Sequence, residues 1–225
     1  MTVRILQGDC RDVLKTLPDE SVHCVVTSPP YWGLRNYGVD RQLGLEESPQ
    51  AYVTAIVDVC RAAHRVLRAD GTLWLNLGDS YSGSGKGGNP EAGKQATNKG
   101  SQSIGVLYGK TGETARQAAV TNVTRRMCAE QGFQPKQLIG IPWRVALALQ
   151  DDGWWLRQDI IWSKPNPMPE SVRDRCTKAH EYIFLLAKSE RYYYDAEAIK
   201  EAALNEGRVV KQYQPDAKNG QSANP

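Results

Sequence analysis

The sequence lacks the features that would place the protein in a membrane or on the secretory pathway. No apolar run approaches the ~18–20 residues that cross a bilayer, and the N-terminal MTVRILQGDCRDV lacks the apolar core of a signal peptide. We therefore expect no membrane partner and a cytoplasmic location. The 5 cysteines are scattered and never form a C-x-x-C pair, which disfavours a disulfide framework and a zinc site.

A strong charge imbalance is also missing. The formal net charge of +3 is too small to indicate nucleic-acid binding by itself. Hydrophobic residues make up 40% and charged residues 24% of the 225 residues, which is typical of a soluble globular chain with one substantial core. The class of function must therefore be sought in local sequence patterns.

The first part of the sequence alternates predicted strands with predicted helices. Val3–Gln7 is a short apolar run that ends at a Gly-Asp pair, and Arg11–Leu17 then predicts a helix that a proline stops. Ser21–Thr27 is a nearly continuous apolar run, the pattern of a strand buried on both faces of a parallel sheet. A helix is expected from the Ser48-Pro49 pair toward Gly71.

The next strand is predicted at Thr72–Leu77, and this order of elements favours a doubly wound α/β domain. From residue 80 to about 105 the sequence becomes rich in glycine and lysine without apolar period, which indicates an insertion or loop. The remaining predicted elements are a helix at Thr114–Gln131, a helix opened by Pro142, a strand at Trp154–Ser163, and a terminal hairpin of Glu181–Lys188 with Arg191–Tyr194.

The most informative segment is the hexapeptide Thr27–Trp32 (TSPPYW), at the carboxyl end of a predicted buried strand, where open α/β sheets bind ligands. Two prolines remove backbone donors and leave carbonyls free to accept hydrogen bonds from a substrate N–H group. The lone pair of a base amine is delocalised into the ring, so its attack on a methyl sulfonium needs acceptors such as Ser28 and the Pro29 carbonyl. Tyr31 and Trp32 would offer aromatic faces to an extruded base. The alternative is a rigid turn that ends a strand.

This hexapeptide resembles motif IV of the DNA amino-methyltransferases, which modify cytosine-N4 or adenine-N6. The similarity extends over roughly residues 3–200, through GTLWLNLGDSY and AHEYIFLLAKSERYYYD among other segments. The resemblance implies an α/β fold with a Rossmann-like, S-adenosylmethionine-dependent methyltransferase sheet. It makes residues 1–200 a catalytic domain, interrupted at 80–131 by an insertion and helix that we take as the candidate target-recognition region, with a polar tail at 201–225.

The resemblance also assigns residues to roles. It gives the catalytic turn as Ser28, Pro29, Pro30 and Tyr31, and the cofactor contacts as Asp9, Cys10, Thr27 and Ser28. It places Lys164 and Asn166 near the target base or the DNA backbone. The further candidate DNA contacts are Trp32, for its aromatic face, and Arg35 and Lys86, for their charge, and no metal is expected. Solvated surface charge is the alternative for the basic residues, and a stiff proline-rich loop is the alternative for Lys164 and Asn166. His180 and Glu181 could orient that loop, although a structural role is favoured for both.

One expected feature is missing. Families with this motif order carry a Phe-x-Gly-x-Gly cofactor loop toward the C-terminus, and the glycine-rich candidate at Gly83–Gly88 is not followed by an amphipathic helix. The sheet is therefore expected to be incomplete at its C-terminal, cofactor-loop part. Strand edges beside Val3–Gln7 and Val22–Thr27 would then lack partners unless a partner chain or a missing segment supplies them.

The predicted function is a site-specific methyltransferase that acts on a flipped base in double-stranded DNA, with S-adenosylmethionine as the methyl donor. Serine rather than aspartate before Pro-Pro-Tyr favours cytosine-N4 over adenine-N6. One alternative is a truncated, catalytically silent DNA-binding fragment or subunit that needs a partner chain. Another is a methyltransferase of RNA or protein amines.

Overall fold

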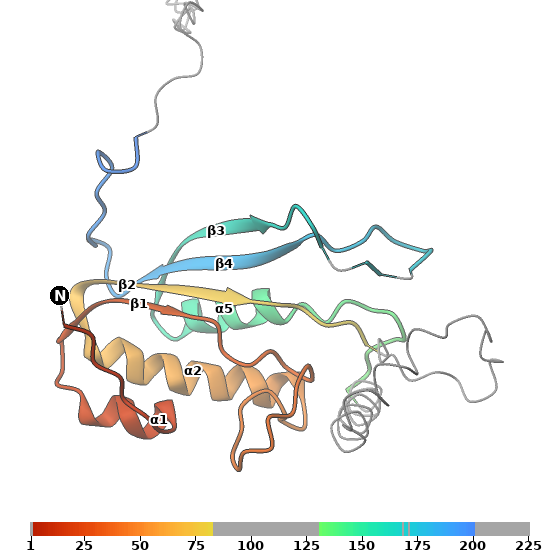
Figure 1. Ribbon diagram of the computed structural model, residues 1–225, viewed down its shortest axis with the longest axis horizontal. Helices are drawn as coiled ribbons and strands as arrows, with labels where there is room; N and C mark the ends of the chain where they lie inside the picture. The colour runs from red at the N-terminus through yellow and green to blue at the C-terminus, as the bar shows by residue number, and fades with distance from the viewer. Residues whose placement is uncertain (1, 83–130, 168, 171, 201–225) are drawn as a thin grey trace, which may run out of the picture. The chain divides into compact units, whose positions relative to one another are not determined.

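The computed structural model describes residues 2–82, 131–167, 169–170 and 172–200 (Figure 1). These residues form a four-stranded mixed sheet in the order β1-β2-β4-β3. The strands are β1 (Val22–Thr27), β2 (Leu67–Leu77), β3 (Trp155–Ser163) and β4 (His180–Ala187). The helices are α1 (Cys10–Val13), a 3-10 turn (Leu14–Thr16), α2 (Pro49–Val66) and α5 (Ile141–Asp151). The expected insertion beyond residue 82, the helix from Thr114 and the tail at 201–225 lie outside the described residues.

The pairing of the strands confirms only part of the expected parallel sheet. β1 and β2 are parallel, whereas β4 is antiparallel to both of its neighbours, β2 and β3. The start of β4 therefore lies at the same edge of the sheet as the carboxyl ends of β1 and β2. This arrangement brings residues from distant parts of the sequence to one edge.

Helix α2 begins where the sequence predicts it. The Ser48 side chain caps the helix by accepting from the Ala51 amide at 3.0 Å, and Pro49 occupies the first turn. The helix ends at Val66, earlier than the predicted Gly71, and the chain passes directly into β2 at Leu67. The buried face of α2 is Tyr52, Val53, Ile56, Val57, Cys60, Ala63 and Val66.

Helix α5 lies beside α2, on the same side of the sheet (Figure 1). Val145, Ala146 and Leu149 are fully buried there. Trp143 and Leu147, two apolar residues of the same helix, are 39% and 51% exposed. The apolar face of α5 is wider than the strip that its neighbours cover, although the Trp143 ring still packs edge-on against two aromatic rings of β4.

The sheet contributes alternate residues to this core. Leu73, Leu75 and Leu77 of β2 are fully buried, and so are Phe184 and Leu186 of β4, which pair with Leu75 and Leu73. Residues of period two that share one face of a sheet build such a layer. The two central strands thus carry most of the sheet's contribution to the core.

The predicted strand at Val3–Gln7 does not form, which is a correction to the sequence analysis. Val3 and Ile5 are 85% and 87% exposed. β1 is an edge strand of the described sheet, and its next-to-last residue, Val26, is 78% exposed, so β1 is not buried on both faces either. A strand needs a neighbour for its backbone groups, and in the described parts of the chain no segment pairs with the outer edge of β1, opposite β2.

The predicted terminal hairpin is also wrong. β4 pairs with β3 and β2, and the residues at Arg191–Tyr194 form no strand. The physical reason is burial: Phe184–Ala187 are buried and need a central position, whereas Tyr193 and Tyr194 are 71% and 55% exposed. Residues 194–225 form a separate compact unit, of which 194–200 are described.

Candidate active site

The turn after β1 is fixed to the underlying helix. The Tyr52 hydroxyl, on the buried face of α2, donates to the Pro30 carbonyl at 2.9 Å. Burial raises the pKa of Tyr52 far above its ordinary value, which keeps this hydroxyl a donor. Within the described chain no hydrogen bond reaches the Pro29 carbonyl, so this oxygen keeps its accepting capacity. The Pro30 carbonyl is therefore held by Tyr52, and the Pro29 carbonyl can accept a hydrogen bond from a ligand.

Trp32 plays a structural part, and the expectation that it contacts DNA is wrong for this structure. Its side chain is 1% exposed and belongs to the core. The indole Nε1 donates to the Glu46 carbonyl at 3.0 Å, and the Trp32 carbonyl accepts from the Ser80 hydroxyl at 3.2 Å. An aromatic residue that is buried and hydrogen-bonded in this way presents no face to a base.

Tyr31 points its hydroxyl into a polar cluster at the edge of the sheet. The hydroxyl lies 2.7 Å from Asn76 Oδ1, 3.2 Å from Glu181 Oε2 and 3.3 Å from Ser28 Oγ. Its ring packs directly on Gly78, where any Cβ would overlap the ring atoms. Partial burial, together with the nearby Glu181 carboxylate, raises the pKa of Tyr31.

Asn76 and Glu181 complete this cluster, and the sequence analysis did not place Asn76 in the site. The Asn76 amide donates to the Tyr182 carbonyl at 3.1 Å, which directs its oxygen toward Ser28 Oγ at 3.1 Å. Glu181 forms an ion pair with Lys164. Partial burial opposes ionisation, but the hydrogen bond and charge of Lys164 outweigh it and lower the pKa of Glu181. Asn76 and Glu181 could be joined to one site only from the strand order, because the antiparallel pairing of β4 with β2 brings Glu181 to this edge of the sheet.

A further carboxylate links the cluster to the fold. Asp79 follows β2 and accepts from the amides of Gly140 and Ile141, each at 3.0 Å, and so caps α5 from a distance. Lys178 lies half-buried nearby, and its burial lowers its pKa against the opposing effect of Asp79 and Glu181. The loop around the site thus carries both signs of charge close together.

The predicted cofactor residues Asp9 and Cys10 lie at the start of α1. Asp9 caps that helix through the Arg11 amide at 2.9 Å and forms an ion pair with the Arg11 guanidinium. These hydrogen bonds from Arg11 lower the pKa of Asp9 well below its ordinary value. Cys10 is exposed at the protein surface, but desolvation by the surrounding protein atoms and the neighbouring Asp9 charge raise the pKa of its sulfur, so it stays a thiol at neutral pH.

The loop after Trp32 connects the Asp9 turn with the turn at Ser28–Tyr31. Arg11 donates to the Arg41 carbonyl at 2.6 Å, and the Gly33 amide donates to the Gly44 carbonyl at 2.7 Å. Gly44, at φ +92°, lies against the backbone oxygens of the Pro30-Tyr31 pair with no room for a side chain. The structure therefore places Asp9 and Tyr31 at two ends of one connected loop.

The other predicted DNA contacts are distributed unevenly. Arg35 and Asn166 are exposed, as a DNA-facing role requires. Lys164 is half-buried and paired with Glu181 rather than directed to solvent. Lys86 lies outside the described residues.

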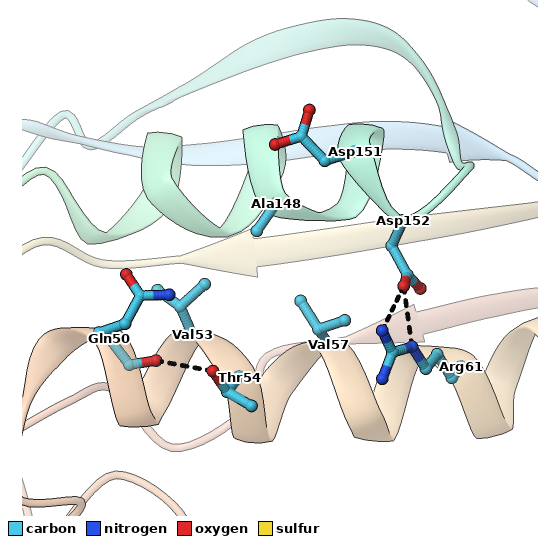
Figure 2. Close-up of a pocket in the computed structure, with 8 residues that line it drawn as sticks. All are labelled: Gln50, Val53, Thr54, Val57, Arg61, Ala148, Asp151 and Asp152. Carbon is cyan, nitrogen blue, oxygen red and sulfur yellow. Dashed lines mark hydrogen bonds and ion pairs between the residues drawn. The ribbon is translucent and has the colours of Figure 1, made fainter.

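A pocket of 310 Å³ lies between α2 and α5, away from this cluster (Figure 2). Arg61 and Asp152 form a hydrogen-bonded ion pair at its rim, at 2.6 Å. Its lining consists of Gln50, Val53, Thr54, Val57, Arg61, Ala148, Asp151 and Asp152. None of these residues belongs to the predicted site, and its charged pair is already satisfied, so we regard this pocket as a groove between packed helices.

Within the described parts of the chain, no group of His, Cys, Asp and Glu side chains is arranged to hold a metal ion. Among the described helices, none is both long and apolar enough to cross a membrane.

Comparison with known proteins identifies the family. Residues 22–222 match the N6/N4 methyltransferase family, described as DNA methylase. The chain belongs to the DNA methylases. It is 49% identical over 197 residues to the Type II methyltransferase M.Cfr9I of Citrobacter freundii, and 48% identical over 200 residues to M.SmaI of Serratia marcescens.

These alignments cover 88% and 89% of the chain but only 58% and 61% of the two relatives. The solved PvuII DNA methyltransferase, described as cytosine-N4-specific, superimposes with a TM-score of 0.53 at 16% identity, over 86% of this chain and 53% of that one. The chain therefore shares the methyltransferase fold and spans little more than half the length of these DNA methylases. S-adenosylmethionine is the methyl donor of the family.

Proposed function

We propose that this chain carries the base-binding half of a site-specific DNA methyltransferase that methylates the exocyclic amine of a flipped base. The observation that carries the proposal is the convergence of Ser28 Oγ, Tyr31 Oη and Asn76 Oδ1 within 3.3 Å of one another, at the residue that precedes Pro29 in sequence. Hydrogen-bond acceptors are what a delocalised amine requires, because they draw its hydrogens out of the ring plane and free the nitrogen lone pair. No covalent intermediate with the enzyme is needed.

S-adenosylmethionine supplies an electrophilic methyl group on a sulfonium. The candidate residues for holding it are Asp9, Cys10, Thr27 and Ser28, and they fit it in part. Asp9 is ionised, and its side chain is 30% exposed, but both of its oxygens already accept from Arg11. Binding of the ribose or adenine by Asp9 would therefore require Arg11 to give way or to share the carboxylate. Half a site of this kind has few contacts to offset the cost of ordering a ligand.

We assign the remaining contacts to double-stranded DNA. Exposed Arg35 and Asn166 flank the cluster in sequence and are the described candidates for backbone contact, whereas Lys86 remains a prediction outside the described residues. Ser28 in place of aspartate favours cytosine-N4 as the acceptor over adenine-N6. Mass spectrometry of nucleosides from methylated DNA distinguishes the two products.

The cofactor half is proposed to come from further polypeptide, either a partner chain or a continuation of this one. Support comes from the unpaired outer edge of β1 in the described sheet, from the exposed apolar residues Val3, Ile5 and Val26, and from relatives that are longer than the matched region. Such an edge is suited to the addition of strands. The second candidate function, a catalytically silent DNA-binding subunit, rests on the same observation.

Calorimetric titration of the purified chain with S-adenosylmethionine, together with methylation assays on DNA, RNA and peptide, tests these assignments. We expect weak cofactor binding and no turnover by this chain alone, and DNA methylation once the completing polypeptide is present. Tight cofactor binding and DNA methylation by the chain alone would contradict the need for completion. Methylation of RNA or peptide but not DNA would overturn the proposed substrate. A completed protein that methylates none of the three would favour the second candidate function, a catalytically silent DNA-binding subunit.

A further inference from the structure

Glu181 contacts both Tyr31 and Lys164, and neither contact has a role in the methyl transfer proposed above. It stands at the start of β4, where the antiparallel pairing brings it to the carboxyl ends of β1 and β2. One carboxylate oxygen, Oε2, lies 3.2 Å from the Tyr31 hydroxyl. The other, Oε1, is bound by the Lys164 ammonium.

We infer that Glu181 is a positioning residue of the methyl-transfer site, which sets the direction of the hydrogen bonds so that Ser28 presents an accepting oxygen to the base amine. This role in catalysis rests on the proposed function, but the effect of Glu181 on Tyr31 does not.

The argument begins with the fact that an ionised carboxylate accepts hydrogen bonds and cannot donate them. A hydroxyl has one proton, so Tyr31 donates inward, to the Glu181 carboxylate or to Asn76 Oδ1 at 2.7 Å. The Tyr31 oxygen is then free to accept from Ser28 Oγ, which lies 3.3 Å away and also 3.1 Å from Asn76 Oδ1. Whether Ser28 donates to the Tyr31 oxygen or to Asn76 Oδ1, its single proton is used inside the cluster. The lone pairs of Ser28 Oγ are then left to accept from the base amine.

Lys164 is the part of the arrangement that keeps Glu181 ionised. Partial burial alone would favour the protonated acid, and a protonated acid could donate to the Tyr31 oxygen and reverse the chain of hydrogen bonds. The ammonium of Lys164 counters this by an ion pair within the partly buried site. The same contact engages the ammonium of Lys164, which was expected on sequence grounds to reach toward DNA, in an ion pair with Glu181.

The substitution Glu181→Gln tests the direction of the hydrogen bonds with almost no change in shape, because its amide can donate to Tyr31. Glu170→Gln is the matched control: Glu170 also pairs with a basic residue, Arg175 at 2.6 Å, and has no contact with Tyr31. Lys164→Arg keeps the counter-charge and is expected to preserve function better than Lys164→Ala.

The first measurement needs no activity. Fluorine NMR of the fluorotyrosine-labelled chain follows the tyrosine signals through a pH titration, and loss of a signal in Tyr31→Phe identifies Tyr31. We expect Glu181→Gln to move the Tyr31 signal and to lower the pKa of this phenol, since the carboxylate that disfavours the phenolate is gone. Glu170→Gln should leave the signal in place. An unmoved Tyr31 signal in Glu181→Gln overturns the inference.

The second measurement is steady-state methylation of DNA by the completed protein. We expect Glu181→Gln to lower kcat about 10- to 100-fold with the KM for DNA near that of the parent, because misdirected acceptors impair the reaction more than binding. The effects of Glu181→Gln and Tyr31→Phe should be less than additive, since both act on one hydroxyl. A change confined to KM, or full additivity, would show that Glu181 does not act through Tyr31. If the parent itself does not methylate DNA, the proposed function fails while the NMR result still decides the contact.

Discussion

The two sides of the sheet differ sharply although their sequences look alike. On one face of the sheet, Leu73, Leu75 and Leu77 of β2 are fully buried under α2 and α5, and Val25 of β1, which pairs with Leu73, packs against the same core. Val26 of β1 pairs with Trp74, lies on the other face and is 78% exposed. Ile5, in an apolar run that predicts a strand, is exposed as well. Burial in the core stabilises apolar strand residues, so the contrast separates a closed side, the face of the sheet under α2 and α5, from an open side, the opposite face at β1 together with the N-terminal segment.

The largest expected effect lies on the closed side. Phe184→Ala removes a fully buried ring from the core and should lower the free energy of unfolding by about 3–5 kcal/mol. Val26→Ala on β1 is the matched open-side change and should alter it by no more than about 0.5 kcal/mol, because an exposed side chain loses little on truncation. Urea denaturation of the purified chain measures the change in unfolding free energy for both variants. Equal losses would mean that Val26 is covered in solution and that the two sides do not differ.

On the open side, function should be more sensitive than stability. Tyr31→Ala is expected to retain the fold and to lower methylation by the completed protein about a thousandfold, because it removes a stacking face and misorients the turn. Trp32→Ala, next to it in sequence, should instead destabilise the protein, since that ring is buried. Methylation rates and unfolding curves of both variants separate the roles. A Tyr31→Ala protein that methylates DNA at nearly the parental rate would refute the assignment of this turn to the base.

A smaller effect is expected from Gly78, where the two sides meet. A methyl group there overlaps the Tyr31 ring, so Gly78→Ala must displace Tyr31 from Asn76 and Glu181. We expect methylation to fall about 10- to 100-fold, less than on loss of the ring, because a displaced ring can still contact a base. The fluorine signal of Tyr31 should move with it. A Gly153→Ala control is strained by its φ of +98° but has open space around it, so it should not move this signal.

Much of the fold follows from local sequence. Ser48 and Pro49 mark the start of α2, Pro18 follows the first short helix, and the apolar runs give β1 and β3 close to their observed bounds. For β2 the predicted end, Leu77, is correct, but the strand begins at Leu67 and not at Thr72. The failures are failures of pairing. The apolar pattern of Val3–Gln7 specifies a strand but not the neighbour that the strand requires, and Arg191–Tyr194 resembles a hairpin arm although β4 takes its partners from β2 and β3.

The candidate site also contains residues that local sequence locates and residues that only strand pairing brings together. The hexapeptide Thr27–Trp32 could be located from sequence because its chemistry is contiguous, yet the sequence could not tell that Tyr31 faces the polar cluster and Trp32 the core. Asn76 and Glu181 could not be joined to it without knowing that β4 runs antiparallel beside β2. Contiguous motifs are therefore predictable from sequence here, and contacts that depend on strand order are not.

The smallest expected effect concerns Asp9, one of the few fixed points of the open side. Its pKa is lowered in the folded protein by the hydrogen bonds from Arg11, so its charge stabilises the fold where the unfolded chain would also be ionised, well above the ordinary value of 3.8. That contribution is lost as the pH falls through the lower folded-state pKa, below which the carboxylate is protonated in both states.

Asp9→Asn keeps a capping oxygen but not the charge, so the free energy of unfolding of the parent should exceed that of the variant by about 0.3–1 kcal/mol at neutral pH. The unfolding free energies of the two proteins should converge as the pH is lowered below about 4, since protonation then removes the same charge from the parent. Asp12→Asn, which breaks an exposed pair with Lys15, serves as the control and should have a smaller effect. A difference between parent and Asp9→Asn that stays constant down to the acid limit would show that the Arg11 pair contributes nothing and that α1 is held by packing alone.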